Sequence, residues 1–307
     1  MSDAMVIVLT AGLVATACAL LGPFLVLRRV ALMGDAVSHA VLPGIVAAFL
    51  IFQTRAPLYV VLGAAVFAVI CVLAIEALRA TGLVASDAAI GLVFPALFAL
   101  GVLGIHRYAD DIHLDLDSTI YGEIAFAPFR TFELLGTELV RSVIVMGVVC
   151  AINLLFVTLL WKELKVTSFD PEFARTIRVS PRLLSRLLLI AVAVTAVTAF
   201  ESVGAILVVT LLIVPAAAAY LLTDRLVAMV VVSVAIGWVS AVVGYWGALR
   251  VDASIAGSMG LCAAALFAVA LLASPRYGLL ARALRRSRRR RAALRALAAP
   301  EGPEPAA

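Results

Sequence analysis

Charged side chains are scarce in this chain of 307 residues. Only 14% of the residues are charged, against about 25% in an ordinary soluble domain, while 64% are apolar. The mean hydropathy is +1.15. This composition excludes a disordered chain, and it cannot supply the polar surface that a water-soluble enzyme needs. Lipid is therefore expected to surround most of the protein.

The sequence motifs of catalysis and nucleotide binding are also missing. The chain has no GxxxxGK[ST] phosphate loop, no HExxH and no GxSxG. Its four cysteines stand singly in apolar runs and form no CxxC pair, so neither a thiolate metal site nor a disulfide framework is indicated. We therefore predict that the chain is not an enzyme and has no nucleotide-binding site of its own.

What the sequence has in abundance is apolar stretches of about 20 residues, the length that a helix needs to cross a bilayer. Helices are expected because every backbone polar group must be satisfied inside lipid. The predicted fold is an all-α integral membrane protein, a polytopic helical bundle of eight to nine spans. The lower number allows for segment 203–222, which contains Pro215 and follows a short turn at Glu201 and Ser202. The stretches are 5–27, 30–52, 58–78, 87–105, 139–161, 183–200, 203–222, 226–249 and 253–273.

The arginines give the bundle an expected orientation. Arg28 and Arg29 directly follow the first stretch, and most other basic residues fall on the same side when the spans are threaded in order. The positive-inside rule then places the N-terminus outside and the C-terminus in the cytoplasm. We expect a transmembrane domain over residues 1–275 and an Arg-rich cytoplasmic tail over 276–307. The tail is expected to rest on the anionic inner leaflet, and it lacks the interleaved aromatic residues of a nucleic-acid-binding segment.

An acid and a histidine stand together inside the second stretch. Asp35 and His39 are four residues apart, so on a helix they share one face. A carboxylate within a span costs about 2.5–3.5 kcal/mol, which calls for a function. Their donor atoms suit Mn²⁺, Fe²⁺ or Zn²⁺, although a pair that only locks helix packing and a proton relay remain alternatives. Two ligands are too few for such an ion, so water, other segments or a second copy of the chain must supply the rest.

Two further acids lie on the predicted external side. Glu201 sits in the short turn before residue 203, where it is either a gate, a ligand at the outer mouth, or simply solvated. Glu123 belongs to the acidic connection between His106 and Glu138, where it is a second candidate for a gate or an entry ligand, and where a salt bridge or a docking contact would also explain it. That acidic connection is expected to raise the local concentration of cations.

Five motifs follow one another along the chain: RRVALMGDAVSHAVLPG at 28–44, SDAAIGLVF at 86–94, FDPEFAR at 169–175, VGAILVV at 203–209 and IVPAAAAYLLTDR at 213–225. Together they resemble the membrane permeases of the manganese/zinc/iron class of ATP-binding cassette importers. The match extends over about residues 5–275, and the first and last motifs are long. Arg178 and Ser180 depart from the resemblance, which leads us to expect a glycine and a small apolar residue there.

The resemblance implies a multi-pass protein of a bacterial cell membrane that imports a divalent metal ion and holds no permanent cofactor. Its partners would be a second permease copy or a related permease, two cytoplasmic ATPases and an external metal-binding protein. Asp35 and His39 would lie on the cation path. The segment that would contact the ATPase and couple it to transport contains Pro215, Tyr220, Thr223, Asp224 and Arg225. A proton-coupled secondary transporter and a metal-chelate permease remain the alternatives, and the choice among Mn²⁺, Zn²⁺ and Fe²⁺ stays open.

Overall fold

The computed structural model describes residues 2–53, 57–108, 124–129, 131–134, 137–274 and 278. Within these residues, nine helices are long and apolar enough to cross a membrane, so the expected all-α bundle is confirmed with nine spans. They are α1 (Asp3–Leu27), α2 (Leu32–Phe52), α3 (Pro57–Ala80), α4 (Ser86–Tyr108), α6 (Arg141–Leu159), α9 (Pro181–Val203), α10 (Ala205–Leu222), α11 (Leu226–Val251) and α12 (Ile255–Ala273). The Arg-rich tail lies outside the described residues, apart from Gly278.

The turn between α9 and α10 differs from the expectation. Glu201 and Ser202 belong to the last turn of α9, and the chain reverses at Gly204 instead, with φ 87° and ψ 155°. Only glycine adopts this conformation without steric cost. From there α10 continues as one helix through Pro215, so segment 203–222 supplies a candidate span of its own, the ninth within the described residues.

Two connections contain structure that the hydropathy pattern did not predict. Before α6, the strands β1 (Thr131–Leu134) and β2 (Thr137–Val140) pair antiparallel, after the short 3₁₀ helix η1 (Ile124–Phe129). Helix α6, the fifth span, therefore begins at Arg141 and not at residue 139. The connection expected over 162–182 contains α7 (Trp161–Phe169) and α8 (Pro171–Thr176). The Asp170 carboxylate accepts the N–H of Phe173 at 2.9 Å and so begins α8.

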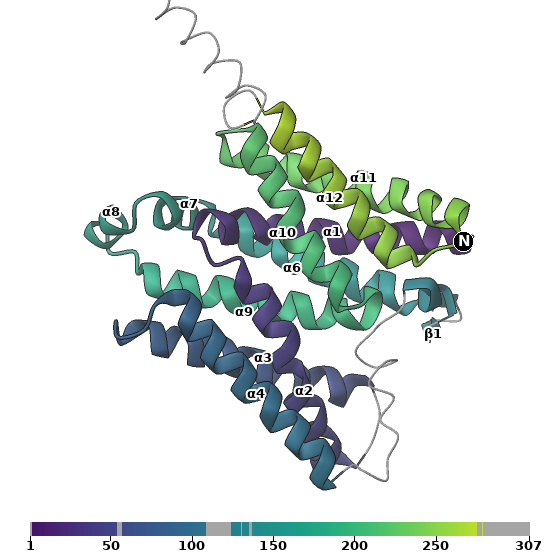
Figure 1. The fold of residues 1–307 in the computed structure, drawn as a ribbon, viewed down its shortest axis with the longest axis horizontal. Helices are drawn as coiled ribbons and strands as arrows, with labels where there is room; N and C mark the ends of the chain where they lie inside the picture. Colours follow the sequence, from purple (N-terminus) through teal and green to yellow (C-terminus); the bar gives the residue numbers. More distant parts are fainter. Residues whose placement is uncertain are drawn as a thin grey trace, which may run out of the picture.

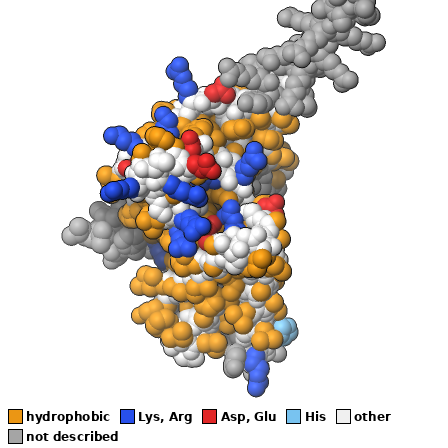
Figure 2. Space-filling model, turned by 90° about the vertical axis from the view of Figure 1, so that its left-hand side faces the viewer, with side chains coloured by type: hydrophobic (Ala, Val, Ile, Leu, Met, Phe, Trp, Pro, Cys, Tyr) orange, Lys and Arg blue, Asp and Glu red, His pale blue; other side chains and the backbone are white. Residues whose placement is uncertain are grey.

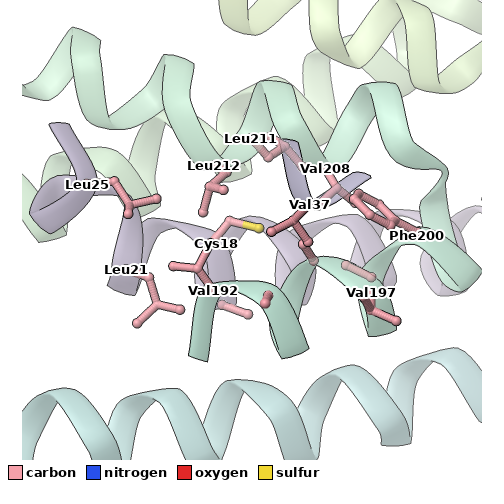
Figure 3. Close-up of a cluster of buried hydrophobic side chains, with 14 of the residues drawn as sticks. Cys18, Leu21, Leu25, Val37, Val192, Val197, Phe200, Val208, Leu211 and Leu212 are labelled. Carbon is pink, nitrogen blue, oxygen red and sulfur yellow. The ribbon is translucent and has the colours of Figure 1, made fainter. Parts of the chain in front are cut away.

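The core forms around α1, the most enclosed of the nine spans. This helix packs against α6, α9, α10 and α11 (Figure 1). Helices α2, α3 and α4 form a second group, and α2 and α3 of that group pack against α9. Apolar side chains from α1, α2, α9 and α10 meet in the centre (Figure 3). They include Cys18, Leu21 and Leu25 of α1, Val37 of α2, Val192, Val197 and Phe200 of α9, and Val208, Leu211 and Leu212 of α10.

The two ends of the bundle differ in charge and in structure. Figure 1 shows the N-terminus and β1 at one end and α7 and α8 at the other. Figure 2 looks at the end that carries α7 and α8, where Lys and Arg side chains gather and outweigh the acids. This is the distribution on which the predicted cytoplasmic side depends.

Buried polar contacts anchor α7 at this end. Arg28, which closes α1, donates from Nη2 to the Thr167 hydroxyl at 2.7 Å and from Nε to the Ser168 hydroxyl at 3.0 Å. Burial lowers the pKa of the Arg28 guanidinium to about 10, and the nearby charge of Glu76 acts in the opposite direction. Glu76 itself pairs with Arg79 at 2.7 Å along α3, as their spacing indicates. The end of the central helix is thus tied to α7 by a charged group that stays protonated at neutral pH.

Candidate metal-binding cavity

The acid and the histidine of α2 lie on one face of the first two turns of that helix. Nε2 of His39 is 3.9 Å from Oδ1 of Asp35, beyond hydrogen-bond distance. Their side chains are 47% and 50% exposed in the single chain. No direct hydrogen bond therefore joins the two side chains, and each exposes about half of its surface in the single chain.

The imidazole of His39 is positioned by two aromatic rings of α4. Phe94 stacks on it, with ring centroids 5.5 Å apart and an interplanar angle of 27°, and Phe98 meets it edge-on at 5.9 Å and 86°. Such contacts fix the ring plane without using either nitrogen. On the same helix the Ser38 hydroxyl donates to the Asp35 carbonyl at 2.6 Å. The donor atoms are thus held by packing and by local backbone contacts.

Both side chains open into a cavity of about 760 Å³ between α2, α4 and α10. Its wall is mostly apolar, with the polar groups gathered on α2 and at two further positions, His106 and Thr210. The complete lining is Asp35, Ser38, His39, Val41, Leu42, Phe98, Val102, Ile105, His106, Ala205, Ile206, Val209 and Thr210. A concave, mostly apolar space with a few polar groups is the usual form of a small-ligand site.

His106 is the lining residue whose place the sequence did not reveal. It was expected in the external connection, but it belongs to the last full turn of α4. The spacing from Phe98 through Val102 to Ile105 and His106 is that of one helical face, and this is the signal that could have found it. Thr210 reaches the cavity from α10, where its hydroxyl donates to the Ile206 carbonyl at 2.8 Å.

Glu201, one of the two acids considered as a gate or an entry ligand, is not among the described residues that line this cavity. Glu201 stands at the end of α9, and its Oε1 is 3.2 Å from Nη2 of Arg141, the first residue of α6. Glu123 lies outside the described residues. A gating role for either acid stays a prediction.

The residues expected to contact an ATPase occupy the basic end of the bundle. Pro215 is buried within α10, and Tyr220 is 42% exposed near the end of that helix. Thr223 ends α10, and its hydroxyl accepts the Arg225 N–H at 3.3 Å in a tight turn that leads into α11. Asp224 and Arg225 are exposed in this turn. Figure 1 shows the turn at the same end as α7 and α8.

A second surface at that end was missed by sequence reasoning. The segment formed by α7 and α8 projects farthest from the bundle (Figure 1), and it exposes Phe169, Phe173 and Ile177 by about half. Large apolar side chains on a polar end face are a mark of protein contact. The signal was present in the FDPEFAR motif, whose apolar residues stand among charges.

Within the described residues, no three His, Cys, Asp or Glu side chains come close enough together to hold a metal ion. One chain brings two candidate ligands, Asp35 and His39, to the cavity wall, and His106 does not form a cluster with them. First-row divalent ions bind four to six ligands. The two candidate ligands on α2 would therefore supply a third to a half of such a coordination sphere.

Comparison with known proteins agrees with the motifs. The sequence profile of the ABC 3 transport family matches residues 1–274. The chain is 44% identical over 280 residues to the zinc transport system membrane protein TroD of Treponema pallidum, covering 91% of this chain and 76% of TroD. It is 40% identical over 280 residues to the manganese transport system membrane protein MntD of Bacillus subtilis, covering 91% and 95%. Among solved structures, PsaBC from Streptococcus pneumoniae in complex with Fab superposes with a TM-score of 0.74 at 28% identity, covering 94% and 96%.

Proposed function

The chain belongs to the ABC 3 transport family, and on this premise we propose that it is the membrane permease subunit of an ATP-driven importer of Mn²⁺, Zn²⁺ or Fe²⁺. It spans the bacterial plasma membrane many times. The observation that carries the proposal is the pair Asp35 and His39 on the wall of a 760 Å³ cavity between three spans. Their oxygen and nitrogen donors match the chemistry of these ions.

The half-exposed state of the pair supports a shared site between two permeases. A carboxylate that faced lipid would be costly, so the face of α2 that carries it needs a polar partner. A second permease copy, or a related permease, placed against this face would supply a second carboxylate and a second imidazole. Four protein ligands then complete a site that one chain leaves half built.

The transport direction follows from the charge distribution. With the basic end in the cytoplasm, the N-terminus is outside and the cavity lies between an external metal-binding protein and the cytoplasm. A bare divalent ion in a low dielectric would cost tens of kcal/mol, so Asp35 and His39 on α2 would stabilise it within the cavity. Closing and opening of the path on either side of the pair would move the ion inward.

Energy is proposed to come from separate ATPase subunits that dock on the basic end. The turn with Thr223, Asp224 and Arg225 remains one candidate contact, as the resemblance implies. The projecting α7–α8 segment is the other, because Phe169, Phe173 and Ile177 offer apolar contact area. The hydrogen bonds from Arg28 to α7 give this segment a rigid link to α1 and so to the core.

The test is metal uptake by the complete complex in proteoliposomes, with the ATPases inside and the metal-loaded binding protein outside. We expect ATP-dependent uptake of radiolabelled free ion, with Mn²⁺, Zn²⁺ and Fe²⁺ competing. Uptake driven by a proton gradient without ATP would instead support the secondary transporter. Uptake of a metal chelate in preference to the ion would support the chelate permease, and either result would overturn the proposal.

A further inference from the structure

We propose that His106 is a second metal ligand on the path, an outer station that receives the cation before it reaches Asp35 and His39. The inference rests on the proposed function and extends it to a residue that the family motifs do not include. All three side chains line one cavity. Since no three such ligands within the described residues form a single cluster, His106 and the α2 pair must act at different positions along the cavity.

The helix geometry gives the separation of the two stations. Phe98 touches the His39 ring, and His106 lies eight positions farther along α4. At 1.5 Å per residue this is about 12 Å along the helix. Helices α2 and α4 lie side by side (Figure 1). They run in the same direction, because α3, which follows α2 and precedes α4 in the chain, runs in the opposite direction. His106 therefore lies on the predicted external side of the pair.

The lining between the stations explains why an outer ligand is needed. The wall over this distance is made largely of Leu42, Val102 and Ile105, which cannot replace the water ligands of an ion. A cation that moves from the aqueous mouth into this apolar section loses hydration without compensation. An imidazole at the outer end offers a nitrogen ligand that all three candidate ions accept. Exchange of one water for His106 would lower the barrier to the next step.

The matched substitutions are His106→Asp and His106→Asn, which differ in ligand chemistry but hardly in size. In the reconstituted complex we expect His106→Ala and His106→Asn to reduce the maximal rate of uptake by roughly tenfold, the lower end of what partners of a metal site contribute. The concentration of loaded binding protein that gives half the maximal rate should change less than about twofold, since docking occurs elsewhere. His106→Asp should restore most of the rate, because a carboxylate also binds these ions.

A structural role would not produce the same pattern. Because oxygen donors favour Mn²⁺ over Zn²⁺ relative to imidazole, His106→Asp should raise the ratio of Mn²⁺ to Zn²⁺ uptake above that of the unsubstituted complex. Leu103→Ala, on the same helix but 68% exposed and outside the cavity lining, serves as the control and should leave both rates unchanged. The proposal is overturned if His106→Ala transports within twofold of the unsubstituted complex, or if Asn restores transport as well as Asp. Absence of ATP-dependent uptake in the unsubstituted complex would instead refute the proposed function.

Discussion

The backbone of Gly44 on α2 lies directly against the backbone of Gly63 on α3, so that a Cβ atom on Gly44 would collide with the Gly63 carbonyl oxygen. The reverse also holds, because a Cβ atom on Gly63 would meet the carbonyl oxygen of Gly44. This close approach fixes the position of α2 relative to α3 at Gly44, five residues after His39. The position of the cavity wall that carries Asp35 and His39 therefore depends on the absence of a side chain at both Gly44 and Gly63.

Gly44→Ala is expected to destabilise the protein and to impair transport. The added methyl group must push α2 away from α3, and overpacking of this kind costs about 1–3 kcal/mol. Thermal unfolding of the purified protein in detergent, together with uptake, measures both effects. Gly91→Ala on α4 is the matched control, since nothing lies within 4 Å of a Cβ atom there. Equal melting temperatures for the two variants would contradict this role of the glycine contact.

Replacement of Asp35 or His39 by alanine should abolish metal uptake by the complex, with a loss of roughly 100-fold or more. The reason is that each removes a ligand at the point where the ion is least hydrated. Assembly with the ATPase and the melting temperature should stay close to normal, because both side chains are about half exposed in the single chain. Ser38→Ala, which removes a neighbouring hydroxyl that donates to the Asp35 carbonyl, should keep most of the uptake. Near-normal uptake by the double alanine variant would mean that the pair serves packing alone.

The loop between α8 and α9 provides a test of backbone strain. Arg178 has a φ of 62°, in the left-handed region that favours glycine, at a position where the resemblance leads us to expect glycine. Arg178→Gly is predicted to stabilise the protein by about 1 kcal/mol, the cost of this conformation for a residue with a Cβ atom. Arg178→Ala removes the same charge but keeps the Cβ atom, so it should show no such gain in thermal unfolding. A gain of equal size in both variants would assign the effect to the charge.

The sequence predicted the spans well because apolar length is a direct requirement of the bilayer. It also placed Asp35 and His39 on one helix face, since a spacing of four residues is decided by helix geometry alone. The aromatic contacts of His39 with Phe94 and Phe98 could not be predicted in this way, because they depend on how α4 packs against α2. The same packing brought His106 into the cavity, although its place in the sequence suggested a loop.

Local contacts account for most of the differences between the predicted and the observed boundaries of the helices. The sequence predicts the turn between α9 and α10 at Glu201 and Ser202, because a charged residue suggests the end of a span. The chain reverses only at Gly204. The structure pairs that charge with Arg141, so the helix can continue past it. Similarly, the many charged residues of 162–182 predict a connection without helices. The Asp170 cap stabilises α8, and the hydrogen bonds of Arg28 stabilise α7.

The last prediction separates the two candidate contacts for the ATPase. Phe173→Ala removes an exposed ring from α8, and charge reversal by Arg225→Glu changes the turn between α10 and α11. If α7–α8 is the main contact, Phe173→Ala should weaken co-purification of the ATPase by about tenfold in affinity, which is the 1.4 kcal/mol typical of a useful interface aromatic. If the turn couples hydrolysis to transport, Arg225→Glu should leave the ATPase bound but reduce the number of ions imported per ATP.

Co-purification and the ratio of uptake to hydrolysis, measured on the same preparations, distinguish these effects. Leu103→Ala, at an exposed position of α4 outside the cavity lining, is the control for both. A variant that changes neither quantity removes its segment from the proposed interface, because a contact that transmits force between subunits must affect either binding or coupling.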